Sequence, residues 1–246
     1  MSESSWTTIS RLSAVVFWSA VALAFTTQME LGDIWWHLKT GELIWQRMAI
    51  PQTDEFSIAF YSPSPFVLRA FWMAQVLFYL VQHSLGFYGL IALKAALFVT
   101  AFWFIHRLML SHGLRPPLSY LLMLPMIVIC TEFDEIRPQT VSIAFFAATI
   151  YLLESRRLAV DAGRAYRPIL LLLPMMLVWS NMHAGFVSGG GVICLYAAYE
   201  LFLSGHSRGE KRFFILTALG ALGCSMLNPN GPAAYMTAAG IFQTAA

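Results

Sequence analysis

Asp33 and His37 stand four positions apart in a polar segment that follows the first apolar stretch of the chain. On a helix their side chains share a face, because residues i and i+4 are neighbours there. Carboxylates and imidazoles are common proton-transfer groups, so the pair is a candidate site. The alternative is that Asp33 only caps the helix that follows, by accepting backbone N–H bonds.

A second cluster is acidic and contains Glu132, Asp134 and Glu135, with Arg137 beside it. Three carboxylates within four residues repel one another unless a cation lies among them. A divalent metal such as Mg or Mn, or a substrate amine, would satisfy them, because hard cations bind carboxylate oxygens. The alternative is a solvated acidic loop. Arg137, held next to Pro138, can neutralise one acid or present its guanidinium to a phosphate.

A third cluster places Asn181 and His183 beside a glycine-rich segment at the boundary of two apolar runs. Polar groups at such a depth in a membrane protein pack against partners or line a cavity. We therefore predict that both contact a substrate. The alternative is that the glycines serve helix packing and that His183 is a hydrogen-bonded core histidine.

The composition indicates which class of protein contains these clusters. Of 246 residues, 58% are apolar and only 11% charged, whereas a soluble domain has about a quarter of its residues charged. This balance excludes a soluble enzyme and a disordered tail, and a net charge of +2 gives no nucleic-acid-binding surface. The three cysteines lie in apolar runs and are predicted to be packing residues.

The apolar residues form long blocks, which predicts an all-α polytopic membrane protein. We expect one membrane domain, residues 1–246, with about seven transmembrane helices. The first span is residues 12–29 and is not a cleaved signal peptide. Six more lie within residues 87–227, at 87–106, 118–131, 140–153, 169–182, 186–203 and 213–227. Several of these runs are short and need flanking residues or a thin bilayer.

The basic residues predict the orientation of the spans, since Lys and Arg concentrate in cytoplasmic loops. If residues 66–85 do not cross the membrane, all the basic clusters downstream fall on the cytoplasmic side together with the amino terminus. Residues 30–86 then form a long external loop with two interfacial helices, 33–48 and 66–85, and residues 228–246 are an external turn and tail. The alternative for residues 66–85 is a tilted or re-entrant span.

The ordered motifs resemble those of the GT-C superfamily of membrane glycosyltransferases, in a poorly characterised bacterial branch. The likeness covers nearly the whole chain and rests on these segments: Asp33-Ile-Trp-Trp-His-Leu38, Gly41, Ile50-Pro-Gln-Thr-Asp54, Phe56-Ser57, Arg137-Pro-Gln139, Asn181-Met-His-Ala-Gly-Phe186 and Asn228-Pro229. The resemblance implies transfer of a sugar from a polyprenyl-phosphate donor on the outer face of a bacterial inner membrane.

The resemblance also implies roles for the three clusters. Asp33 would be the base or a metal ligand, with His37 orienting it, and Glu132 with Asp134 would bind the metal. Arg137, Asn181 and His183 would bind the phosphate or the sugar, and the prenyl chain would lie between residues 66–85 and the spans. Superfamily members usually continue into further spans, whereas this sequence matches only their amino-terminal module. The alternative is therefore a non-catalytic subunit of the same fold that docks with partner proteins in a larger membrane complex.

Overall fold

The computed structural model describes residues 3–26, 32–53, 56, 70–131, 135–236 and 238, with side chains from residue 9 onward. Its elements are α1 (Glu3–Ala24), α2 (Ile34–Arg47), α3 (Trp72–Ser111), α4 (Pro116–Thr131), α5 (Pro138–Asp161), the 3₁₀ turn η2 (Arg167–Leu171), α6 (Leu172–Met182), α7 (Phe186–Phe202) and α8 (Arg208–Ser225). The described chain contains helices and no strands, which confirms the all-helical prediction.

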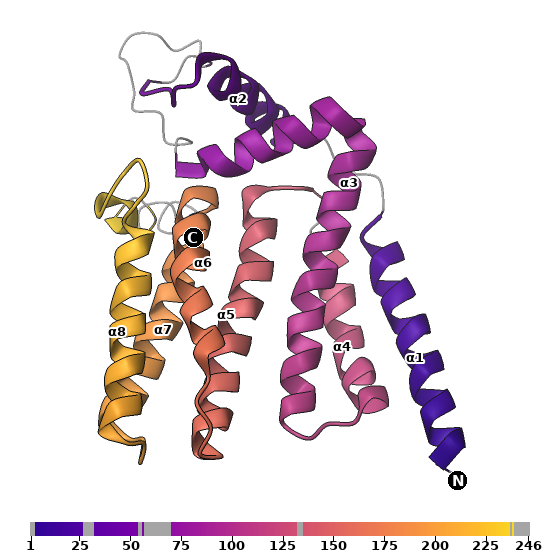
Figure 1. The fold of residues 1–246 in the computed structure, drawn as a ribbon. Coiled ribbons are helices and arrows are strands. Elements are labelled where there is room, and N and C mark those ends of the chain that lie inside the picture. The colour runs from indigo at the N-terminus through magenta and orange to yellow at the C-terminus, as the bar shows by residue number, and fades with distance from the viewer. Residues whose placement is uncertain are drawn as a thin grey trace.

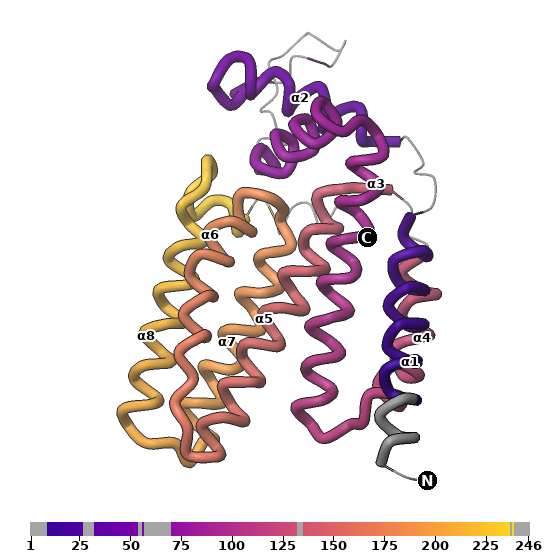
Figure 2. Tube along the Cα trace, turned by 45° about the vertical axis from the view of Figure 1, so that its right-hand side comes forward, coloured from indigo at the N-terminus to yellow at the C-terminus, as the bar shows by residue number. Residues whose placement is uncertain are grey.

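The helices form an upright bundle with a cap across one end (Figures 1 and 2). The bundle consists of α1, the second part of α3, and α4 to α8, standing side by side. The cap consists of α2 and the first part of α3, which lie across the bundle. The interfacial helix predicted at residues 66–85 corresponds to the first part of α3, from residue 72, while residues 66–69 lie outside the described chain.

The bend between cap and bundle is at Gly86, whose φ of 66° and ψ of −165° interrupt the helical backbone of α3. A positive φ is strained for residues with a Cβ, so glycine suits this corner. The cap is held tightly by a second glycine, Gly41 of α2. A Cβ there would overlap the backbone carbonyl of Gln75, so its absence lets α2 lie directly on α3.

Three buried apolar clusters hold these parts together. One joins α5 to α8 around Trp179, Phe186 and Phe214. A second joins α1, α3 and α4 around Phe17 and Phe98, and a third fixes the cap to the bundle through residues that include Ile34, Phe78 and Val141.

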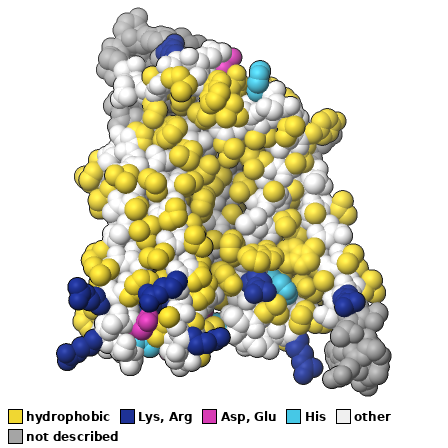
Figure 3. All heavy atoms as spheres, in the orientation of Figure 1, with side chains coloured by type: hydrophobic (Ala, Val, Ile, Leu, Met, Phe, Trp, Pro, Cys, Tyr) yellow, Lys and Arg dark blue, Asp and Glu magenta, His cyan; other side chains and the backbone are white. Residues whose placement is uncertain are grey.

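The outside of the bundle is apolar as well. Large exposed apolar side chains on its helices include Leu12, Val15, Val16, Leu121, Leu122, Val128, Leu195 and Leu219. Figure 3 shows apolar side chains across the middle of the molecule and Lys and Arg gathered at the end away from the cap.

One described helix, α3, is by itself long and apolar enough to cross a membrane. The segments Ile9–Ala24, Pro116–Thr131, Arg167–Met182 and Phe186–Phe202 are apolar but shorter. At about 1.5 Å per residue, the 17 residues of α7 reach less than the ~30 Å of a bilayer core. Length and apolarity therefore identify one spanning helix in the described chain, and not the predicted seven.

Candidate functional site

The cap end of the bundle brings together residues that lie far apart in the sequence. Asp33 immediately precedes α2, and Arg137 immediately precedes α5. Their side chains form an ion pair, with 3.6 Å between Arg137 Nη2 and Asp33 Oδ2. The Asp33 side chain makes no capping hydrogen bond to α2, although the residue stands at the N-cap position. Its carboxylate is 62% exposed and therefore open to a ligand.

Arg137 lies between two carboxylates, because it is also paired with Glu135. The hydrogen bond to Glu135 raises the pKa of Arg137, and the nearby charge of Asp33 acts in the same direction. The guanidinium is still 37% exposed. A partly exposed arginine of this kind can exchange a carboxylate partner for a phosphate, to which its planar fork binds well.

His37 of α2 and His183, which follows α6, both lie beside the ring of Phe71. The ring of Phe71 stacks on His183 with a centroid separation of 5.4 Å. It is T-shaped to His37, with a centroid separation of 6.5 Å. Burial lowers the pKa of His37 to about 4; the Asp33 charge opposes this, and the Arg137 charge adds to it. Burial likewise lowers the pKa of His183 to about 4, with His37 as a secondary cause. Both imidazoles are therefore neutral at pH 7.

Hydrogen bonds assign the tautomer of His183. The backbone N–H of Gly185 donates to His183 Nδ1 at 3.0 Å, so this nitrogen is an acceptor. Ser142 Oγ lies 2.7 Å from the same nitrogen and must donate its proton to it. Trp179 Nε1–H in turn donates to Ser142 Oγ at 2.7 Å. The proton of the neutral ring is therefore on Nε2, which makes His183 a hydrogen-bond donor.

Asn181 is engaged in holding helices together. Its Oδ1 accepts a hydrogen bond from Trp72 Nε1 at 2.7 Å, and its Nδ2 donates to the carbonyls of Leu177 and Leu227 at 2.8 and 2.9 Å. The amide thus joins α3, α6 and the segment after α8. These bonds favour a structural role for Asn181, and its predicted contact with substrate stays a prediction.

The predicted metal ligands Glu132 and Asp134 lie outside the described residues. Within the described ranges no three side chains of His, Cys, Asp or Glu come together as a metal site. The two described carboxylates nearby, those of Asp33 and Glu135, are both paired with Arg137. A divalent metal at this end therefore stays a prediction.

Ser142, Trp179, Phe71 and Trp72 contribute to the site and were not predicted from the sequence. Each lies in or beside an apolar run, where packing is the simplest interpretation. The partners of Ser142 and Trp72 are 41 and 109 residues away along the chain, so no local spacing indicates them.

The lowered pKa values of His37 and His183 predict a loss of stability in acid. The unfolded chain, in which histidine has a pKa near 6.5, takes up these protons first as the pH falls, so stability is full above about pH 6.5 and declines towards pH 4. At ~1.4 kcal/mol per pKa unit, the loss is up to ~3 kcal/mol for each ring. Thermal unfolding midpoints between pH 7 and pH 4 measure it.

The double variant His37→Gln/His183→Gln should show a shallower dependence of the midpoint on pH. His83→Gln, a change at an exposed histidine on the cap, should leave the dependence unaltered. An equally steep decline in the double variant would show that the two buried rings are not its source.

No protein-family model matches this chain, and neither a curated protein nor a solved structure is detectably similar to it.

Proposed function

We propose that this chain is a multi-pass protein of a bacterial inner membrane whose bundle crosses the bilayer about seven times. The predicted apolar runs overlap α1, the second part of α3, and α4 to α8, and the outer surface of these helices is apolar. The helices of the bundle support one another, so short ones can span a locally thin bilayer.

The distribution of charge supports an orientation with the cap outside. Basic side chains at the far end of the bundle belong to the α3–α4, α5–α6 and α7–α8 connections and the adjoining helix ends: Arg107, Arg115, Arg156, Arg157, Arg164, Arg167, Arg208, Lys211 and Arg212. Figure 3 shows Lys and Arg concentrated at this end. Because basic loops stay in the cytoplasm, we assign this end and the amino terminus to the cytoplasmic side.

Cysteine labelling tests the orientation. In intact cells, an impermeant thiol reagent should modify a Glu42→Cys variant on the cap. An Arg164→Cys variant should react only after the cells are permeabilised. Labelling of position 164 in intact cells would place the site on the wrong side for this function.

We infer that the cap end catalyses transfer of a sugar from a polyprenyl-phosphate donor. The observation that carries this inference is the convergence of Asp33, Arg137 and the two buried histidines from distant segments. A base, an anion-binding cation and a neutral hydrogen-bond donor are what such a transfer requires. The resemblance of the ordered motifs to GT-C enzymes adds to this argument.

Asp33 accepts the proton of the acceptor hydroxyl while the hydroxyl oxygen bonds to the anomeric carbon of the sugar. The bond from that carbon to the phosphate oxygen breaks, and its electrons leave with the lipid phosphate. Positive charge develops on the sugar ring and negative charge on the phosphate, so Arg137 stabilises the leaving group. The Nε2–H of His183 donates a hydrogen bond to the phosphate or the sugar.

Purified full-length chain in liposomes tests the activity. Donors would be polyprenyl phosphates carrying a panel of radiolabelled hexoses and pentoses, with membrane lipids as acceptors and Mg or Mn supplied or chelated. We expect transfer of label from at least one donor, and none with empty liposomes. Failure of every donor would contradict the proposal.

The second candidate is a non-catalytic subunit of a membrane complex. It is favoured by the apolar surface of α2, where Trp35, Trp36, Trp45 and Met48 are exposed, by 48% to 82% of their surface. Exposed large apolar side chains at a protein surface suit a protein partner. Isolation with stoichiometric partners, together with no effect of an Asp33→Asn change on the cell, would support this candidate over the enzyme.

A further inference from the structure

An apolar groove of about 640 Å³ runs down the side of the bundle from the candidate site. Its walls come from α3, α4, α5, α6 and the beginning of α7. Along α5 it extends from Gln139 to Ile150, which is roughly 16 Å at about 1.5 Å per residue. The volume lies in the range of small-molecule binding pockets.

The polar and apolar parts of the groove are separated. Gln139, Ser142 and Ser188 lie at the ends of α5 and α7 nearest the cap. Most of the remainder is hydrocarbon and includes Ile105, Leu108, Met126, Phe146 and Ile150. A molecule that matches both parts has a long hydrocarbon chain and a polar group at one end.

The polar end of the groove carries no charge. None of its twelve lining residues is ionisable. A phosphate lying there would lack a charged partner, which is costly at a buried site. The cation of the candidate site, Arg137, is not among the lining residues. The groove therefore fits an uncharged polar group better than a phosphate.

Ser142 connects the groove to the candidate site. Its hydroxyl donates a hydrogen bond to His183 Nδ1, and its oxygen accepts one hydrogen bond from Trp179 Nε1. A hydroxyl oxygen has two lone pairs, so one further hydrogen bond can be accepted from a ligand. The group that fits is the O–H of an alcohol or a sugar. Bound to Ser142, it would lie beside the hydrogen bond between Ser142 and His183.

We propose that this groove binds an uncharged lipid alcohol, whose chain lies along α5 and whose hydroxyl donates to Ser142. The inference rests on the proposed function in one respect, since it names this lipid as the acceptor of the sugar. The donor phosphate then belongs at Arg137. The hydroxyl that attacks the anomeric carbon comes from the groove side, and during the reaction it exchanges its hydrogen bond to Ser142 for one to Asp33.

Photo-crosslinking of the purified full-length chain tests the inference. The probe is a long-chain alcohol with a diazirine in its chain, and the comparison probe is the phosphate ester of the same alcohol. We expect the alcohol to label peptides of α3, α4 and α5, which line the apolar part of the groove, at least ten-fold more strongly than the ester. Equal labelling by both probes, or labelling confined to other helices, would overturn the inference.

Variants assign the label to the groove. Ala147→Trp fills the groove midway along α5 and should reduce labelling at least ten-fold. The control is Ala198→Trp, at an exposed alanine of α7 outside the groove, which should label as the native chain does. Because a tryptophan can disturb folding, Ser142→Ala is the second variant. It leaves the groove open but removes the oxygen to which the hydroxyl donates, so labelling by the alcohol should fall while labelling by the ester stays low.

The outcome is independent of sugar transfer. Labelling needs neither a donor nor Asp33, so an Asp33→Asn chain should label normally. Normal labelling without sugar transfer from any donor would contradict the proposed activity but would still support the lipid-binding groove. Sugar transfer without selective labelling of the groove would support the proposed activity and contradict the lipid-binding groove.

Discussion

Replacing Asp33 by Asn should abolish sugar transfer, with a rate reduction on the order of 10³-fold, because a positioned general base contributes roughly 10²- to 10⁴-fold. The amide has nearly the shape of the carboxylate but cannot accept the proton of an acceptor hydroxyl. Stability should change little, since Asp33 is exposed and Arg137 keeps its bond to Glu135. Initial rates of transfer and thermal unfolding midpoints, measured on the same preparation, separate the two effects.

Glu42→Gln is the matched control for this change. Glu42 is an acid of α2, the helix that Asp33 precedes, and its only described ionic partner is Lys39 at 2.8 Å. The Glu42→Gln chain should transfer sugar at the native rate. Asp33→Glu should retain part of the activity, because it keeps the base and moves it. Near-normal transfer by the Asp33→Asn chain would remove Asp33 from the mechanism.

The helical class and the division into bundle and cap could be predicted because they depend on patterns visible over many residues. Apolar runs separated by polar connections indicate helices, and the basic connections favour the prediction that residues 66–85 do not cross the membrane. The boundaries were less accurate. The run at residues 140–153 is part of α5, which continues to Asp161. Charges at Glu154, Arg156 and Arg157 mark the end of the apolar run but not of the helix.

The candidate site was predicted where a short spacing carries the information. Asp33 and His37 lie four residues apart at the start of α2, and Arg137 is next to a proline, so each is noticeable in the local sequence. The approach of Arg137 to Asp33, and of Phe71 to His183, depends on how the cap folds back over the bundle. Such contacts depend on the tertiary packing of α2 and α3, which no single segment of the sequence reveals.

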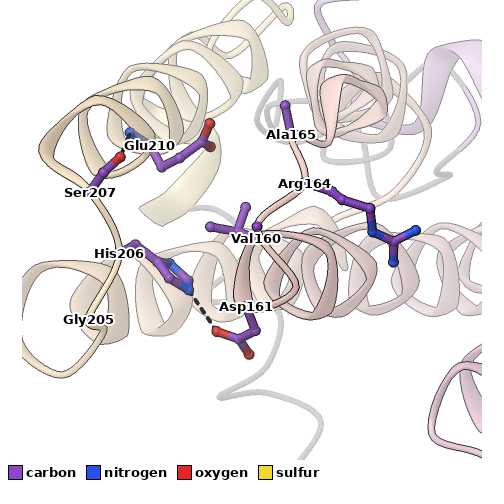
Figure 4. A pocket seen from close by; sticks show the side chains of 9 residues that line it. Val160, Asp161, Arg164, Ala165, Gly205, His206, Ser207 and Glu210 are labelled. Atoms are coloured by element: carbon purple, nitrogen blue, oxygen red, sulfur yellow. Dashed lines mark hydrogen bonds and ion pairs between the residues drawn. The ribbon is translucent and has the colours of Figure 1, made fainter.

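The opposite end of the bundle also contains contacts that no local sequence spacing reveals. Arg156 and Glu200 are separated by 44 residues and form an ion pair in which each side chain is at most 3% exposed. Glu200 also lies 3.0 Å from His206 Nδ1, and His206 Nε2 contacts Asp161 at 2.8 Å. Figure 4 shows His206 pointing from the α7–α8 connection to Asp161 at the end of α5. The network joins α5, α7 and the connection to α8.

Replacing Glu200 by Leu should be among the most destabilising single changes in this chain. Removal of one member of a buried ion pair typically costs about 3–5 kcal/mol, because the other charge is left without its partner. Here Arg156 would keep a longer contact, 3.8 Å, to the partly exposed Glu210 carboxylate, so we expect a loss near the lower end of that range. Arg156 would keep the Glu210 carbonyl at 3.1 Å and the face of Phe214 at 4.5 Å. Its Nε already has no hydrogen-bond partner among the described residues. Thermal unfolding midpoints in detergent measure the loss.

Two further variants distinguish an unpaired charge from lost packing. The double variant Arg156→Met/Glu200→Leu removes both charges and should recover most of the stability, since apolar replacements of a buried pair are often neutral or better. Arg164→Met is the control, because Arg164 lies just after the same helix and is exposed. That change should cost no more than about 1 kcal/mol. If the double variant were as unstable as Glu200→Leu alone, the loss would come from packing, and the ion pair would not be what stabilises this end of the bundle.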